Sequence, residues 1–110
     1  MSKRSTDLLK GTLDLLILRT LELGPRHGVA IADRIAQITR GTFVVKPGSL
    51  FPALHRLEAE GWVRGEWSET AEGRRAKVYT LSAAGRKQLG IEKRNWLKIS
   101  AAMGQVLEAE

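Results

Sequence analysis

The sequence contains no cysteine, which excludes disulfide bonds, a thiol nucleophile and thiolate metal ligands. Histidine is nearly as scarce, since His27 and His55 are the only two. No glycine-rich phosphate loop follows a strand pattern, and no cluster of metal-ligating residue types occurs. We therefore expect a protein that is not an enzyme and that carries neither a metal nor another cofactor.

Long apolar runs are also missing. The leucine-rich stretch near the start of the chain is interrupted by charged residues, among them Asp14 and Arg19, and no small-residue cleavage site follows it. A membrane-spanning helix needs about 20 consecutive apolar residues, and no stretch approaches that length. We expect a soluble, cytoplasmic protein that makes no membrane contact.

Acidic residues are the minority among the charged ones. The 110 residues include 18 lysines and arginines against 12 aspartates and glutamates, which gives a formal net charge of +6. A surplus of this size in one small domain fits a polyanionic partner such as nucleic acid. It fits a merely well-solvated surface equally, so charge alone leaves both interpretations open.

Helical spacing of leucine and isoleucine predicts helices over residues 7–23 and 28–40, with Gly41 as the C-terminal cap of the second. The first helix has a wide apolar face, which should be covered on two sides. The buried side of the second helix is expected to comprise Ile31, Ala32, Ile35 and Ile38.

Short segments rich in β-branched and aromatic residues predict the strands. Residues 42–45 can form a small strand, and the alternating segments 62–67 and 76–81 form a hairpin with a polar tip between them. Helix, helix, small strand, helix and hairpin is the order of a winged helix-turn-helix domain. We therefore expect a mainly helical α+β fold with this domain over residues 1–81.

The third helix, between Pro47 and Gly61, opens with a proline and a glycine and has Pro52 inside its apolar pattern. Pro52 is harmless if the helix begins near Ser49, and it kinks the helix if it begins at Pro47. One face carries the expected core residues Leu50, Ala53, Leu54 and Leu57. The opposite face comprises Gly48, Ser49, Pro52, His55, Arg56 and Ala59. A slim helix start with free N–H groups and the positive dipole end can approach a polyanion closely.

The last segment predicts a long helix. Ser82 is a suitable N-cap, and helix formers continue over residues 83–108, a length of about 39 Å at 1.5 Å per residue. An apolar stripe at nearly heptad spacing comprises Leu89, Trp96, Ile99, Met103 and Val106. Because this length exceeds what a small globule covers, we expect residues 82–110 to form a homodimerisation helix. The alternative is that the helix folds back on its own domain.

Four segments closely resemble the phenolic acid decarboxylase regulator (PadR) family of bacterial transcription factors: "GTLDLLILRTL", "HGVAIADRI", "GSLFPALHRLEAEGWV" and "RRAKVYTLSAAGRKQL". The match covers about residues 8–90 and looks like the branch with a single C-terminal helix. The resemblance implies a homodimeric winged-helix repressor. Its third helix enters the major groove, its wing lies over the backbone or minor groove, and its last helix forms the dimer.

Two positions depart from the family pattern. The family usually has tyrosine where this chain has Val29, and Leu-Tyr-Pro where it has Leu50-Phe51-Pro52. Both replacements remove a phenolic hydroxyl. If those hydroxyls bind phosphate in relatives, this protein lacks two such contacts per subunit.

On the DNA-binding hypothesis, Ser49, His55 and Arg56 of the third helix face bases or phosphates. Arg56 is the best candidate for bidentate reading of a guanine edge, because its fork of donors matches the guanine acceptors. The expected phosphate contacts are Lys46, Arg74, Arg75 and Lys77. A two-fold dimer predicts an operator with inverted half-sites about one helical turn apart.

Trp96 allows two interpretations. It either seals the dimer interface or stacks on a small aromatic or hydrophobic effector that releases the repressor. The second interpretation is one that the family resemblance implies. Trp62 and Trp67 are expected to be packing residues of the hairpin. The alternative function is a winged-helix protein-interaction module without specific DNA binding, because a fold alone does not establish function.

Overall fold

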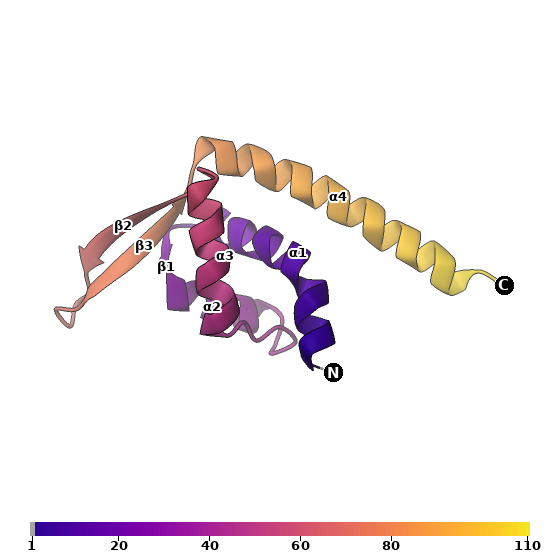
Figure 1. Ribbon diagram of the computed structural model, residues 1–110, viewed down its shortest axis with the longest axis horizontal. Helices are drawn as coiled ribbons and strands as arrows, with labels where there is room; N and C mark the ends of the chain where they lie inside the picture. Colours follow the sequence, from indigo (N-terminus) through magenta and orange to yellow (C-terminus); the bar gives the residue numbers. More distant parts are fainter. Residues whose placement is uncertain (1) are drawn as a thin grey trace.

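The computed structural model describes the backbone of residues 2–110 and the side chains from residue 11 onward. Within that part the chain forms four helices and three strands (Figure 1). In chain order these are α1 (Ser2–Glu22), β1 (Arg26–His27), α2 (Gly28–Ile38), α3 (Pro47–Ala59), β2 (Val63–Glu69), β3 (Arg75–Leu81) and α4 (Ala83–Glu108). The mainly helical fold with a small antiparallel sheet is the one that the sequence predicted.

The core is built around α1, which contacts α2, α3, β3 and α4. Ile17 and Leu18 on this helix are completely buried, as expected for an apolar face covered on two sides. The other helices and the base of the hairpin close around them. The buried apolar residues are Leu13, Ile17, Leu18, Leu21, Ile31, Ile35, Leu50, Ala53, Leu54, Leu57, Val63, Tyr79, Leu81 and Leu89.

The sheet has the strand order β1-β3-β2, and both pairings are antiparallel. The hairpin is in register from Val63 opposite Leu81 to Glu69 opposite Arg75, so its strands run further toward the tip than predicted. The small strand predicted at residues 42–45 is wrong, because β1 occupies the free edge of β3. Phe43 and Val45 pack against the core instead and anchor the connection that leads into α3.

α2 is two residues shorter than predicted. It ends at Ile38, which is 53 % exposed, so the prediction that Ile38 belongs to the buried side of this helix is wrong. The chain then turns through Gly41, whose φ of +81° suits a residue without Cβ. The Gly41 N–H donates to the Ala36 carbonyl at 2.8 Å, so the predicted cap is confirmed.

α4 begins where the sequence predicted. Its N-cap is Ser82, whose Oγ accepts a hydrogen bond from the Gly85 N–H at 3.0 Å. The first turns pack against α1, and the helix then projects away from the body (Figure 1). The molecule is accordingly elongated, with extents of 60 × 31 × 21 Å. Leu89 lies in the packed part and is 2 % exposed, so it belongs to the chain's own core and is not available to a second copy.

Candidate nucleic-acid interface

α3 begins at Pro47, with Lys46 as its N-cap, so Pro52 lies inside the helix. Proline has no N–H, and the carbonyl four residues earlier, that of Gly48, therefore receives no hydrogen bond from position 52. The N–H groups of Ser49 and Leu50 both donate to the Lys46 carbonyl, at 3.0 and 2.9 Å. The first turn consequently has fewer free donors than the sequence suggested.

The two faces of α3 are divided as predicted. The residues of the core stripe are at most 2 % exposed, whereas a shallow open depression runs along the outside. The lining of this depression consists of Phe51, Pro52, His55, Arg56 and Ala59. A Cβ added at Gly48 would meet no atom within 4 Å, so the helix start is slim and open. A face of this shape allows another molecule to approach the backbone.

The aromatic ring of Phe51 packs on the start of α2. A Cβ added at Gly28 would lie 2.8 Å from the edge of this ring, so the contact requires glycine there. The next residue, Val29, is 60 % exposed. The two departures from the family pattern therefore lie close together, where α2 begins beside α3.

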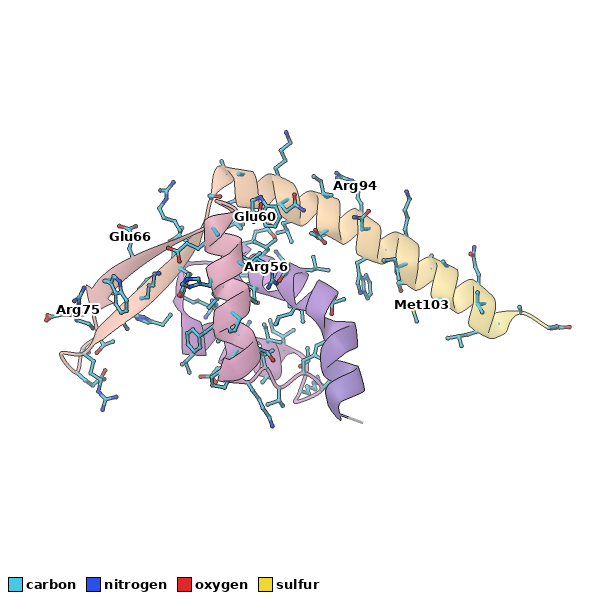
Figure 2. All side chains as sticks on the ribbon, in the orientation of Figure 1. Arg56, Glu60, Glu66, Arg75, Arg94 and Met103 are labelled. Carbon is cyan, nitrogen blue, oxygen red and sulfur yellow. The ribbon has the colours of Figure 1, made fainter. Side chains whose placement is uncertain are left out.

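Arg56 lies at the edge of α3 that faces α1 and not in the middle of the outer face of this helix. Its guanidinium donates to Oδ1 of Asp14 on α1 at 2.5 Å, and Figure 2 shows the side chain beside α3 on that side. Burial raises the pKa of the Asp14 carboxyl above its ordinary value; Arg56 opposes this increase, and the charge of Glu92 on α4 adds to it. Arg56 therefore connects α3 to α1, and Glu92 on α4 also affects the pKa of Asp14.

The opposite edge of α3 is connected to the hairpin. Nζ of Lys77 donates to Oε1 of Glu58 at 2.9 Å, and the hydrogen bond to Glu58 raises the pKa of Lys77. The same ammonium lies 5.6 Å from the centre of the Tyr79 ring. Lys77 was predicted to bind phosphate, but here its charge is already paired within the protein. It fixes the orientation of the wing relative to α3.

The tip of the hairpin carries exposed cations. Arg74 lies in the turn, where the Thr70 N–H donates to its carbonyl at 2.7 Å, and Arg75 opens β3. The Arg75 guanidinium lies 5.2 Å from the centre of the Trp67 ring. Trp67 is 60 % exposed, so the prediction that it is a packing residue is wrong, whereas Trp62 is partly buried against the core as expected.

The remaining predicted contacts also belong to α3. Lys46 is exposed at the helix start, His55 is exposed in the middle of the outer face, and Ser49 is half-buried. Together with Arg56 they place polar groups along one helix, whereas Arg75 lies away from it, toward the tip of the hairpin (Figure 2). The sequence pattern did not reveal Trp67, because alternation identifies the face of a strand but not where the hairpin extends beyond the core.

A separate apolar surface lies on the projecting part of α4. Its side chains remain exposed: Trp96 by 43 %, Ile99 by 58 %, Met103 by 57 % and Val106 by 75 %. Figure 2 shows Met103 and Arg94 on opposite sides of this helix. We call Trp96, Ile99, Met103 and Val106 the α4 stripe. Exposed apolar side chains in one row mark a contact surface.

Two other kinds of site are absent from the part of the chain that the structure describes. Among the residues with described side chains, no three of histidine, aspartate or glutamate are grouped so that they could hold a metal ion. None of the helices in this part is long and apolar enough to cross a membrane.

Comparisons with known proteins agree on one family. Residues 17–91 match the model of the transcriptional regulator PadR-like family. The chain is 40 % identical over 68 residues to transcriptional regulator Rv3488 of Mycobacterium tuberculosis, covering 62 % of this chain and 60 % of that protein.

Solved structures give the same result over nearly the whole chain. A transcriptional regulator from Clostridium thermocellum superposes with a TM-score of 0.83 at 25 % identity, covering 90 % of this chain and 96 % of that one. A PadR family transcriptional regulator from Eggerthella lenta superposes with a TM-score of 0.84 at 26 % identity, covering 99 % and 93 %. The fold is therefore shared with these regulators.

Proposed function

The chain belongs to the PadR-like family of transcriptional regulators, and from this premise we propose that it is a homodimeric repressor that binds duplex DNA through α3 and the wing. The observation that carries the proposal is the outer face of α3. This face is open and slim at Gly48, and the wing beside it is fixed by Lys77 and Glu58. Members of this family are transcriptional regulators and not enzymes.

In this proposal α3 lies in the major groove. Ser49 and His55 contact base edges or phosphates, and Arg56 exchanges its Asp14 partner for a guanine edge. The phosphate contacts come from Lys46 at the helix start and from Arg74 and Arg75 on the wing. Phosphate contacts set the position of a protein on the duplex, whereas base contacts select the sequence.

The second copy binds along the α4 stripe. Residues 82–110 then form the dimerisation helix, and residues 1–81 form the DNA-binding domain. The exposure of Ile99, Met103 and Val106 supports this division, because a monomer would leave these side chains in water. Two-fold symmetry gives an inverted-repeat operator with half-sites about one helical turn apart.

Release requires a signal, and Trp96 is the residue of the α4 stripe that suits one. Its half-exposed indole would face its counterpart across the dimer axis, where a flat aromatic or hydrophobic effector can stack. Quenching of Trp96 fluorescence by flat aromatic dyes tests this role against a purely sealing one. Equal dye binding by a Trp96→Ala variant would leave Trp96 with the sealing role.

The test of the DNA-binding function uses a labelled duplex from the region upstream of the protein's own gene. Fluorescence anisotropy at two salt concentrations should give sequence-dependent binding that weakens steeply with salt, because counterions are released from the duplex. Absence of binding at both concentrations would contradict the proposal and favour the protein-interaction module.

Arg74→Gln is the variant that identifies the surface used. It should weaken binding to all sequences alike and make the salt slope shallower by about one for each lost contact. Arg94→Gln, which removes an exposed cation from α4, is the matched control and should leave the slope unchanged. If both variants behave alike, the wing is not the binding surface.

A further inference from the structure

Trp67 is a large aromatic side chain without a place in the core. It is 60 % exposed, and it pairs across the hairpin with Lys77. Residues alternate along a strand, so Trp67 shares its face with Val63, which is 3 % exposed, and with Tyr79 and Leu81 across the hairpin. That face begins in the core and continues outward along the wing. Trp67 therefore extends this apolar face into a part of the wing that the core does not cover.

Two cations flank this indole. The Arg75 guanidinium lies 5.2 Å from the ring centre and the Lys77 ammonium lies 6.0 Å from it. Both distances are within the range of cation–π attraction. An arginine stacked on an aromatic ring is pre-organised, and its guanidinium is weakly hydrated, so it loses little on binding a phosphate.

The face with Trp67 is also the face of the wing that meets α3. A Cβ added at Gly65, on this face, would lie 3.1 Å from Oε2 of Glu58. Glu58 in turn holds Lys77 at 2.9 Å. Trp67 and α3 are therefore connected through Lys77 on one side of the wing.

We propose that Trp67 is a DNA-contacting residue of the wing. Its indole lies against the deoxyribose of one backbone strand, while Arg75, stacked on the ring, binds the adjacent phosphate. The inference rests on the proposed function and adds a residue that neither the sequence pattern nor the family resemblance assigned.

The ligand that fits is the backbone of a duplex and not a single strand. Proteins that bind single strands stack successive bases on several aromatic side chains. In the described part of the chain, this face of the wing exposes one aromatic ring, that of Trp67, because Tyr79 is only 6 % exposed. A single ring with the Arg75 guanidinium beside it matches one sugar and one adjacent phosphate, while Lys77 stays paired with Glu58.

The first measurement uses a protein in which Trp62 and Trp96 are replaced by phenylalanine, so that Trp67 is the only indole. Circular dichroism checks that this doubly substituted protein folds. If it does not fold, the fluorescence measurement is made on a protein that retains Trp62 and carries only the Trp96→Phe substitution. Addition of the upstream duplex should change the Trp67 emission and reduce its quenching by acrylamide, because the backbone covers the ring.

The second measurement compares affinities in the otherwise unsubstituted protein. Trp67→Ala should weaken binding about tenfold on every duplex alike, and Trp67→Phe should retain most of the affinity, because the ring still supports Arg75. Leu23→Ala is the matched control, since Leu23 is a similarly exposed apolar residue, at 47 %, that lies just after α1. It should bind like the unsubstituted protein.

The outcomes separate this inference from the proposed function. If the unsubstituted protein binds no duplex, the proposed function itself fails. If it binds, but Trp67→Ala binds equally well and acrylamide still reaches Trp67 in the complex, only the role of Trp67 is overturned. The exposed ring would then serve another contact, such as one with a protein.

Discussion

At the scale of single residues, two cations at the edges of α3 are held by carboxylates of the protein itself. Arg56 is paired with Asp14 at one edge of the helix, and Lys77 with Glu58 at the other. Both pairs are partly exposed, so each contributes little to stability. Their importance is positional. They fix α3 against α1 and against the wing before any DNA is bound.

The pH dependence of stability tests the surroundings of Asp14. Burial raises the pKa of this carboxyl above 3.8 in the folded protein, so the folded state holds the proton more tightly than the unfolded state. This contribution to stability is fully present below the unfolded pKa and is lost as the pH rises through the folded pKa. Denaturant unfolding from about pH 3.5 to 7 should show the unsubstituted protein losing stability relative to Asp14→Asn. A relative gain would mean that the ion pair with Arg56 outweighs burial.

The specificity of Arg56 gives a second prediction. Arg56→Ala should cost about 1–3 kcal/mol of binding free energy, at one base pair in each half-site, if this side chain reads a guanine. Competition binding with operators substituted one base pair at a time measures both the cost and its position. Unchanged affinity and unchanged preference would show that Arg56 remains with Asp14 in the complex.

At the scale of elements, the start of α4 depends on a close approach that only glycine permits. A Cβ added at Gly85 would overlap the Trp62 carbonyl oxygen and press on a Leu81 methyl group. We expect Gly85→Ala to lower the free energy of unfolding by about 1–3 kcal/mol, because the backbone there has no room to move.

Gly90 of the same helix is the control for this substitution. A Cβ added there would meet only Arg94, at 3.6 Å, which is ordinary contact. Gly90→Ala should therefore stabilise the helix by about 0.5–1 kcal/mol, the usual difference between the two residues. Denaturant unfolding of the two variants side by side gives the comparison, and equal losses would contradict the packing at Gly85.

Elements with a strong local pattern were predictable from the sequence. The bounds of α4, the Ser82 cap and the inner face of α3 follow from apolar spacing and capping chemistry, which are properties of neighbouring residues. The order of the helices and the hairpin followed from the same patterns, but the small strand lies at Arg26–His27 and not at the predicted residues 42–45. Arg74 and Arg75 were placed correctly on the wing for the same reason, since a charged turn between two alternating segments defines a hairpin.

Features that depend on distant parts of the chain were not predictable. β1 has two residues and exists only because β3 offers a free edge to it. Leu89 continues the α4 pattern without a break, yet α1 covers it and leaves the later positions exposed. Asp14 is one of several charged residues in a leucine-rich helix, and only the fold brings it to Arg56, 42 positions away.

At the scale of the whole molecule, the projecting half of α4 gives the chain its elongated shape and carries the α4 stripe away from α3. A dimer formed along this stripe would present two copies of α3 with a spacing set by the length of α4. The net charge of +6 on each chain then becomes an attraction for the duplex, while the apolar stripe provides the cohesion between copies.

Met103→Glu tests the stripe as the dimer contact. A charge buried without a partner between two helices should raise the dissociation constant of the dimer about tenfold or more. Sedimentation velocity over a concentration series measures this constant. Lys98→Glu places the same charge on exposed surface of α4 outside the stripe and should leave the dimer intact. If neither variant changes the dissociation constant of the dimer, the α4 stripe is not the interface.

In the proposed complex, two copies of α3 enter successive major grooves of one duplex. Hydroxyl-radical footprinting of both strands of the upstream region measures this directly. We expect two protected regions related by two-fold symmetry, with centres about 10 base pairs apart on one side of the duplex. A single protected region, or protection without this symmetry, would contradict it.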